Sequence, residues 1–157
     1  MTENSTKLDD HDKRILRHLT QDGRMSITQL ADAIALSPNA TSERLRRLQR
    51  SGVIAGYHAR LSPAALGLKL TCFVEVKLDR VAEDVFDAFA KAARASEDIE
   101  ECYLTAGGFD YLLKTRHRDM EGFRAFLTSN LLRLPGVRET HTFTVMEAVK
   151  EGAGPHI

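Results

Sequence analysis

The stretch that decides the fold is SITQLADAIALSPNATSERLRRLQRSG, residues 26–52. Residues 26–29 form a capping box, which predicts a helix that ends near Leu36. Ser37-Pro38 predicts a second helix start almost at once, because a serine cap and a proline in the first turn both favour initiation. Gly52 predicts the end of that second helix. Two short helices joined by a tight turn are typical of a helix-turn-helix.

A further helix is expected before this pair and an extended segment after it. Asp9 is the expected N-cap of the first helix, with Asp10 and Asp12 in the first turn, where the helix dipole favours negative charge. Asp22-Gly23 predicts its end. Residues 53–57, VIAGY, predict a short strand that begins a wing. The N-terminal third therefore predicts a winged helix-turn-helix.

The rest of the chain alternates between strand and helix patterns. The expected order is a strand at 70–78, a helix from about 82 to 95, strands at 99–106 and 109–116, a helix capped by Asp119 and a last strand from 137 to about 149. The two glycines at 107 and 108 indicate a hairpin. This β-α-β-β-α-β order is ferredoxin-like, so the predicted class is α+β. We expect a DNA-binding domain at 1–60, a short helical hinge at 61–69 and a ferredoxin-like domain at 70–157.

One face of the predicted sheet has no helix to cover it. The two helices of such a module pack on one side, and the first strand presents Thr71, Phe73, Glu75 and Lys77 on the other. This mixture of aromatic and charged residues differs from a simple solvated surface. A second copy of the chain would cover the face, so we expect a homodimer.

The net charge of the 157-residue chain is zero, from 22 basic and 22 acidic residues, but the two parts differ. Residues 1–60 carry 10 Lys and Arg against 7 Asp and Glu, net +3, and residues 61–157 carry 12 against 15, net −3. Four arginines lie between 44 and 50, where their local field matters more than the total charge.

Several classes of protein are excluded by what the chain lacks. No apolar run approaches the roughly 20 residues of a membrane span, and no export signal precedes the first helix, so we expect a cytoplasmic protein with no membrane contact. Cys72 and Cys102 are then expected to be reduced core thiols. The six histidines match no zinc spacing, and no phosphate loop or nucleophile motif occurs. We expect no metal, no cofactor and no enzymatic activity.

The outward face of the helix at 38–50 is the candidate DNA-binding surface. In a helix-turn-helix the second helix lies in the major groove, with base contacts near its start and phosphate contacts around it. We expect base contacts from Asn39, Ser42 and Glu43, phosphate contacts from Arg47 and Arg50, either kind from Arg46, and the helix cap from Ser37. The alternatives are a solvated helix face and a winged-helix module that binds protein in place of DNA.

Four motifs together resemble the Lrp/AsnC family of feast/famine regulators. They are LSP at 36–38, RLRRL at 44–48, GVIAGY at 52–57 and GGFDYLL at 107–113. The resemblance extends from about residue 8 to residue 150 and is closest to the leucine-responsive group. It implies a transcriptional regulator of amino-acid metabolism that binds double-stranded DNA as a homodimer, assembles into tetramers or octamers, and responds to an amino-acid effector bound between C-terminal domains.

The resemblance also places the effector site. It implies contacts from Gly107, Gly108, Phe109, Asp110, Met120, Leu132, Phe143, Thr144 and Val145. The chemistry fits an amino acid, because glycines let backbone N–H groups approach a carboxylate and Asp110 offers an anion for an α-ammonium group. Taken alone, these residues also fit a plain hairpin.

The effector's identity stays open because Gly108 stands where the family usually has an acidic or polar residue. Leucine or another apolar amino acid is the leading expectation. The alternative function is a winged-helix oligomeric regulator or partner-binding module with a different small molecule or with no effector.

Overall fold

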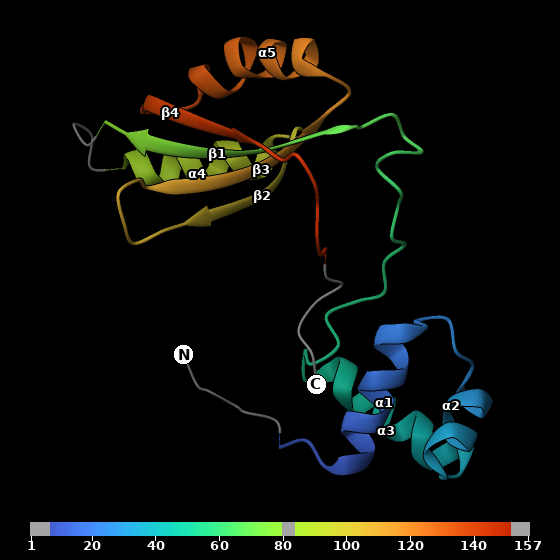
Figure 1. Ribbon diagram of the computed structural model, residues 1–157. Helices are drawn as coiled ribbons and strands as arrows, with labels where there is room; N and C mark the ends of the chain where they lie inside the picture. Colours follow the sequence, from blue (N-terminus) through green and yellow to red (C-terminus); the bar gives the residue numbers. More distant parts are fainter. Residues whose placement is uncertain (1–6, 80–83, 152–157) are drawn as a thin grey trace. The chain divides into compact units, whose positions relative to one another are not determined.

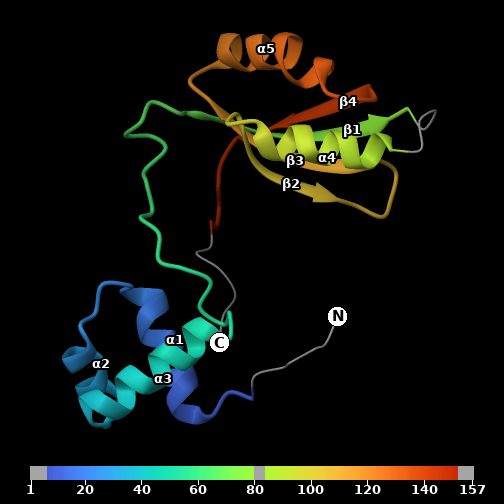
Figure 2. The same cartoon turned by 180° about the vertical axis from the view of Figure 1, so that it is seen from behind.

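The computed structural model describes residues 7–79 and 84–151 of the chain. The described chain divides into two units, one of residues 7–60 with 150–151 and the other of residues 61–79 with 84–149, and each unit has its own apolar core. The first unit is helical and the second is a sheet with helices (Figures 1 and 2). Every helix within the described ranges is too short or too polar to cross a bilayer.

Within residues 7–60 the structure contains the helices α1 (Asp10–Gln21), α2 (Ile27–Ile34) and α3 (Pro38–Arg50). The three predicted caps are confirmed. Asp9 and Ser26 each form a capping box with the residue three positions further on, and Ser37 Oγ accepts a hydrogen bond from the backbone N–H of Ala40 at 3.2 Å. The apolar faces of the helices meet in a core formed by Ile15, Leu16, Leu30, Ile34 and Leu48.

Two predictions for this unit were wrong. The second helix ends at Ile34, because Ala35 adopts a left-handed conformation with φ of 57° and closes it there. Residues 53–57 form a bend followed by an irregular segment and no strand, and residues 58–69 supply no second strand to pair with them. The backbone N–H of Ile54 instead donates to the carbonyl of Leu48 at 3.1 Å, which ties the segment to α3.

The second unit confirms the predicted β-α-β-β-α-β order. Its elements are β1 (Leu70–Leu78), α4 (Val85–Ala95), β2 (Ile99–Leu104), β3 (Tyr111–His117), α5 (Met120–Ser129), a short 3-10 turn η1 (Leu131–Arg133) and β4 (Val137–Thr144). The strands form an antiparallel sheet in the order β2-β3-β1-β4. The predicted helix start near Ala82 lies outside the described residues.

The core of this unit lies between one face of the sheet and the helices α4 and α5. Alternate residues of β1, among them Cys72, Val74 and Val76, are buried against Phe89 of α4 and Phe126 of α5. Figure 2 shows α4 in front of the strands on this side. Cys72 and Cys102 are both free thiols, and burial raises the pKa of each.

Three further details differ from the prediction. The last strand ends at Thr144, which pairs with Cys72, and Val145 adds one more backbone hydrogen bond, from its N–H to the carbonyl of Thr71 at 2.9 Å, close to the start of β1. The hairpin between β2 and β3 is longer than two residues, because the backbone N–H of Thr105 pairs with the carbonyl of Asp110 at 2.9 Å. The hinge contains a hydrogen-bonded turn at 63–67 where a short helix was expected.

The turn into β4 requires glycine at position 136, which leads to a first prediction. Gly136 has φ of 72°, and a Cβ there would collide with Cγ2 of Val85. We expect Gly136→Ala to lower the free energy of unfolding by about 2–5 kcal/mol, from left-handed strain and overpacking together. Gly67→Ala is the control, since Gly67 also has a positive φ, 76°, but no described atom lies within 4 Å of its Cβ position.

Urea unfolding of the two variants measures the difference. The control is expected to lose only the strain component, about 1–2 kcal/mol. Equal losses in the two variants would contradict a collision at Val85.

Candidate DNA-binding and effector sites

The outward face of α3 gathers five of the residues predicted to bind DNA. They line one hollow of about 380 Å³, and they are Asn39, Ser42, Glu43, Arg46 and Arg50. Their spacing of three and four residues places them on one side of a helix. Ser37 lies at the start of the same helix, where its hydroxyl is used as the cap.

Arg47, also predicted to bind DNA, is held by α1. The Asp12 side chain is wholly buried, at 0% exposed, and Arg47 Nη2 lies 2.5 Å from its Oδ2. Arg44 Nη1 lies 3.0 Å from Asp12 Oδ1 and 2.6 Å from Asp9 Oδ2. We call these four residues, Asp9, Asp12, Arg44 and Arg47, the Asp12 cluster. The arginine predicted to bind a phosphate therefore already has a carboxylate partner.

The Asp12 cluster stabilises its own charged state. The backbone N–H of Asp12 and the guanidinium of Arg44 lower the pKa of Asp9 from 3.8 to about 2. The hydrogen bond from Arg44 to Asp9 raises the pKa of the arginine in turn. These shifts keep Asp9 and Arg44 paired as ions across the neutral and moderately acidic range.

Sequence reasoning missed the Asp12 cluster. It placed Asp12 in the first turn of α1 for its favourable interaction with the helix dipole, and it assigned Arg44 no contact. The spacing of Asp9 and Asp12 could have indicated the capping box that they form. The pairing with α3 spans 32 and 35 residues and depends on how α1 and α3 pack, so no local pattern indicates it.

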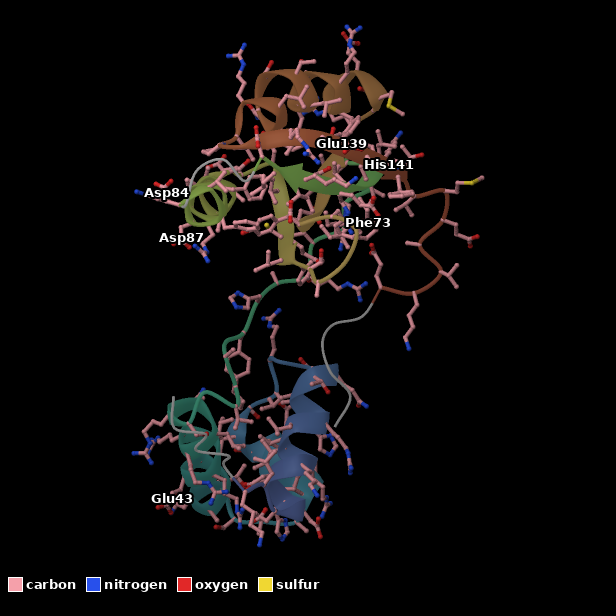
Figure 3. The ribbon with its side chains drawn as sticks, turned by 90° about the vertical axis from the view of Figure 1, so that its left-hand side faces the viewer. Glu43, Phe73, Asp84, Asp87, Glu139 and His141 are labelled. Atoms are coloured by element: carbon pink, nitrogen blue, oxygen red, sulfur yellow. The ribbon has the colours of Figure 1, made fainter. Side chains whose placement is uncertain are left out.

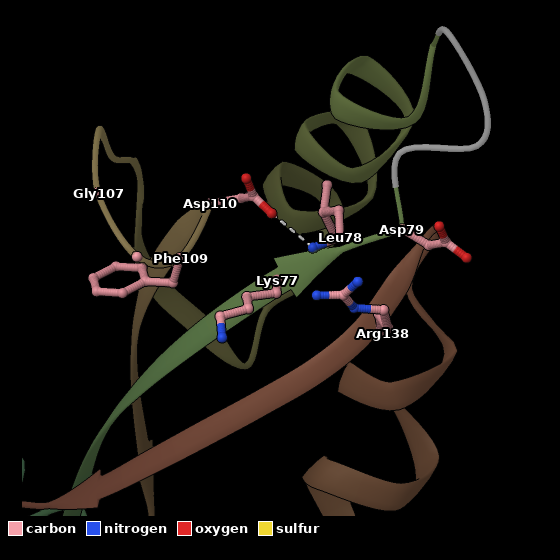
Figure 4. A pocket seen from close by; sticks show the side chains of 8 residues that line it. Lys77, Leu78, Asp79, Gly107, Phe109, Asp110 and Arg138 are labelled. Atoms are coloured by element: carbon pink, nitrogen blue, oxygen red, sulfur yellow. Dashed lines mark hydrogen bonds between the residues drawn. The ribbon is translucent and has the colours of Figure 1, made fainter.

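The glycine hairpin borders the second candidate site. Gly107, Gly108, Phe109 and Asp110 line a hollow of about 470 Å³ at the end of β1 (Figure 4). Asp110 is only 7% exposed, and its Oδ2 accepts a hydrogen bond from the backbone N–H of Leu78 at 2.8 Å. Its carboxylate thus holds the hairpin against β1, as the plain-hairpin interpretation expects, and it also borders the hollow.

Three charged residues of this hollow were not predicted. Lys77 and Asp79 come from β1 and the residue after it, and Arg138 comes from β4. Lys77 Nζ pairs with Glu139 Oε2 at 3.2 Å, whereas Arg138 makes no hydrogen bond or ion pair within the described part of the chain. Only the sheet brings these residues together with the hairpin, since about 30 residues of sequence separate each strand from it.

The remaining predicted effector residues do not line this hollow. Met120, Leu132 and Phe143 are exposed, and Phe143 pairs with Phe73 on β1, five residues before Leu78. At about 3.4 Å per residue, that spacing separates Phe143 from the hairpin end by about 17 Å. Thr144 and Val145 lie further still from the hairpin. One copy of the chain therefore does not bring the predicted effector residues together.

The face of the sheet opposite the helices carries aromatic and charged side chains. We define the uncovered sheet face by the outward residues of β1 and β4, which are Thr71, Phe73, Glu75, Lys77, Glu139, His141 and Phe143. Figure 3 shows Phe73, Glu139 and His141 on the side of the sheet away from α4. The rings of His141 and Phe143 stack at 4.7 Å, and Phe143 remains 48% exposed.

Comparison with known proteins finds a match for each of the two units. A model of winged helix-turn-helix DNA-binding domains matches residues 8–55, and a model of the Lrp/AsnC ligand binding domain matches residues 71–155. The fold and its two sites thus define a DNA-binding transcriptional regulator with a C-terminal ligand-binding domain. The chain belongs to the Lrp/AsnC family.

Individual relatives support this assignment. The leucine-responsive regulatory proteins of Escherichia coli (strain K12) and Klebsiella pneumoniae are each 50% identical over 144 residues, 92% of this chain and 88% of theirs. A transcriptional regulator from Neisseria meningitidis, solved with L-Met, is similar with a TM-score of 0.89 at 32% identity, over 94% of this chain and 95% of that one. The structure of Escherichia coli AsnC is similar with a TM-score of 0.84 at 25% identity, over 92% of this chain and 96% of that one.

These findings confirm the predicted fold class and the predicted function as a transcriptional regulator. Because the family consists of regulators, the expectation that the chain is not an enzyme is confirmed as well.

The pKa of Asp9 leads to a prediction about pH. A carboxyl whose pKa is about 2 in the folded chain, against 3.8 ordinarily, stabilises the fold above about pH 4 and loses that contribution as the pH falls to about 2. Asp9→Asn keeps a capping oxygen but removes the charge that faces Arg44. We therefore expect the variant to melt below the wild type at pH 6, and the difference to close between about pH 4 and pH 2.

Melting followed by circular dichroism across this range measures the effect. Asp10→Asn is the matched control, because the Asp10 side chain is 98% exposed and makes only a 3.9 Å contact with Lys13. A melting difference for Asp9→Asn that stays constant with pH would contradict the role of its charge.

Proposed function

We propose that α3 binds in the major groove of double-stranded DNA. In this arrangement Asn39, Ser42 and Glu43 contact base edges, while Arg46 and Arg50 contact phosphates. The observation that carries the proposal is that these five residues line one hollow on the outward face of α3. The opposite face of the helix is buried in the core of the unit, so only this side can meet DNA.

The two units divide the work in this proposal. Residues 1–60 bind DNA, residues 61–69 join the units, and residues 70–157 bind the effector and assemble the protein. The protein acts in the cytoplasm, where the DNA of its bacterial relatives lies.

The two arginines of the DNA face provide a direct test. Arg46→Ala and Arg50→Ala are each expected to weaken binding to duplex DNA and to reduce the slope of log K against log salt by about 1, because each removes one phosphate contact. Fluorescence anisotropy with a labelled duplex over a range of salt concentrations measures this slope. Arg124→Ala, an exposed arginine on α5, is the control. Unchanged slopes in both α3 variants would exclude this face as the phosphate-binding surface.

We also propose that the protein is a homodimer that pairs through the uncovered sheet face and assembles further into tetramers or octamers. Phe73 and Phe143, which are opposite each other in the register of β1 and β4, supply apolar surface, and the surrounding charges supply complementary partners for a second copy. A mixed face of this kind is more typical of an interface than of a solvated surface.

The proposed effector is leucine or another apolar amino acid. The names of the leucine-responsive relatives and the L-Met in the Neisseria meningitidis regulator support this class of ligand. In the hairpin hollow, Arg138 and Lys77 supply positive charge for an α-carboxylate, and Asp110 and Asp79 supply negative charge for an α-ammonium group. Met120, Leu132, Phe143, Thr144 and Val145 would complete the site from another copy of the chain.

Calorimetric titration with the common amino acids tests the effector. We expect saturable binding of an apolar amino acid, weakened about tenfold or more by Arg138→Ala because a charge-assisted hydrogen bond is lost. Arg94→Ala, an exposed arginine on α4, should bind as the wild type does. Light scattering with and without the amino acid should show a change in assembly.

Asp110→Asn separates the ligand contact of Asp110 from its structural role, because the variant keeps an oxygen to accept the N–H of Leu78 but removes the charge. Undiminished binding in this variant would remove the Asp110 carboxylate from the ligand contacts. Failure of every amino acid to bind would favour the alternative of a different effector or none.

A further inference from the structure

The Asp12 cluster uses arginines that sequence alone would assign to the DNA surface. Asp12 Oδ2 has two partners, Arg47 Nη2 at 2.5 Å and the backbone N–H of Asp9 at 3.1 Å. Asp12 Oδ1 is bonded by Arg44 at 3.0 Å. The carboxylate is wholly buried, so these groups replace water as its source of compensating charge.

This burial restricts what Arg47 can do. If its guanidinium turned away to a DNA phosphate, Asp12 Oδ2 would keep only one backbone partner inside the protein. A buried carboxylate that loses a cation is strongly destabilised, whereas a surface arginine that changes partner is not. Arg46 and Arg50, which no carboxylate holds in the described structure, carry no such restriction.

The arrangement also fixes the orientation of α3. Arg44 and Arg47 lie one turn apart on α3, and Asp9 and Asp12 lie one turn apart at the start of α1. Two such connections resist rotation of α3 about its own axis. Apolar packing alone would resist this rotation less specifically, because apolar contacts are not directional. A rotation of α3 would move every side chain on its outward face relative to the DNA.

We propose that Arg47 and Arg44 are positioning residues that orient α3 through the buried Asp12 carboxylate, and that neither contacts a DNA phosphate. The proposal rests on the DNA-binding role of the outward face of α3. It assigns the four clustered arginines to two tasks: Arg46 and Arg50 face the DNA, and Arg44 and Arg47 hold the helix that presents them.

The test compares Arg47→Ala with Arg46→Ala on two duplexes. One is selected from a random pool by the wild-type protein, and the other has a fixed mixed sequence of the same length. We expect Arg46→Ala to lower affinity for both and to reduce the salt slope by about 1. Arg47→Ala should leave the salt slope unchanged and lower affinity about tenfold or more for the selected duplex only, because misorientation loses base contacts.

Two lysine variants, Arg47→Lys and Arg46→Lys, keep the test valid if Arg47→Ala unfolds. A lysine also binds phosphate but does not reproduce the geometry of a guanidinium at a carboxylate. We expect Arg47→Lys, with a melting temperature above the assay temperature, to lose selected-duplex affinity at unchanged slope, while Arg46→Lys retains affinity. Wild-type behaviour of Arg47→Lys on both duplexes would overturn the proposal.

A double-mutant cycle with Asp12→Asn gives the second measurement. If Arg47 acts through Asp12, Arg47→Ala should have little further effect on selected-duplex affinity in the Asp12→Asn background, while Arg46→Ala should keep its full effect. Additive effects of Asp12→Asn and Arg47→Ala, or a salt slope reduced by about 1 in Arg47→Ala, would overturn the proposal. An unchanged slope in Arg46→Ala would instead count against the proposed DNA face itself.

Discussion

The alternation of side chains along β1 is the constraint on which the second unit depends. Because successive residues of a strand point to opposite faces, Val74 and Val76 are buried under the helices while Phe73 lies on the uncovered sheet face. β1 has a hydrogen-bonded neighbour on each side, so a shift of one residue would expose the core along the whole strand. The same strand separates the hairpin hollow at Leu78 from Phe143. A ligand of amino-acid size that touches both groups requires more than one copy of the chain.

The first unit depends on polar interactions more than its apolar pattern suggests. Its buried core is small, and three side-chain caps organise the helix starts. The Asp12 carboxylate adds a connection between α1 and α3 whose rupture would be costly. Breaking a fully buried ion pair costs about 3–5 kcal/mol, and the cost is lower here because the Arg47 side chain is 47% exposed. The total stability of a typical domain is about 5–15 kcal/mol, so even this lower cost matters.

The features that the sequence predicted correctly are those with local causes. Asp9, Ser26 and Ser37 each cap a helix through a hydrogen bond to the residue three positions further on. The alternation along β1 places one set of residues on each face of a sheet, whichever strands pair with it. The end of β4 at Thr144 is different, because it depends on where β1 begins. The residues of the α3 face and the hairpin hollow could be named in part from spacing and resemblance.

The partners of those residues could not be named. Arg47 meets Asp12 across 35 residues, and Arg138 joins the hollow only because β4 pairs with β1. A charged side chain carries no local sign of which opposite charge it will meet. The sequence therefore indicated where charges gather, whereas the structure decides which of them are already paired.

This distinction changes the meaning of the charge on the DNA-binding unit. The four arginines between 44 and 50 form a strongly basic run in sequence, but Asp9 and Asp12 neutralise two of them inside the protein. Arg46 and Arg50 remain, next to the acidic Glu43, so the outward face of α3 itself carries little net positive charge. Affinity that arises from phosphate contacts grows with their number. With so few contacts per copy, the proposed assembly through the second unit would raise affinity by letting several copies bind DNA at once.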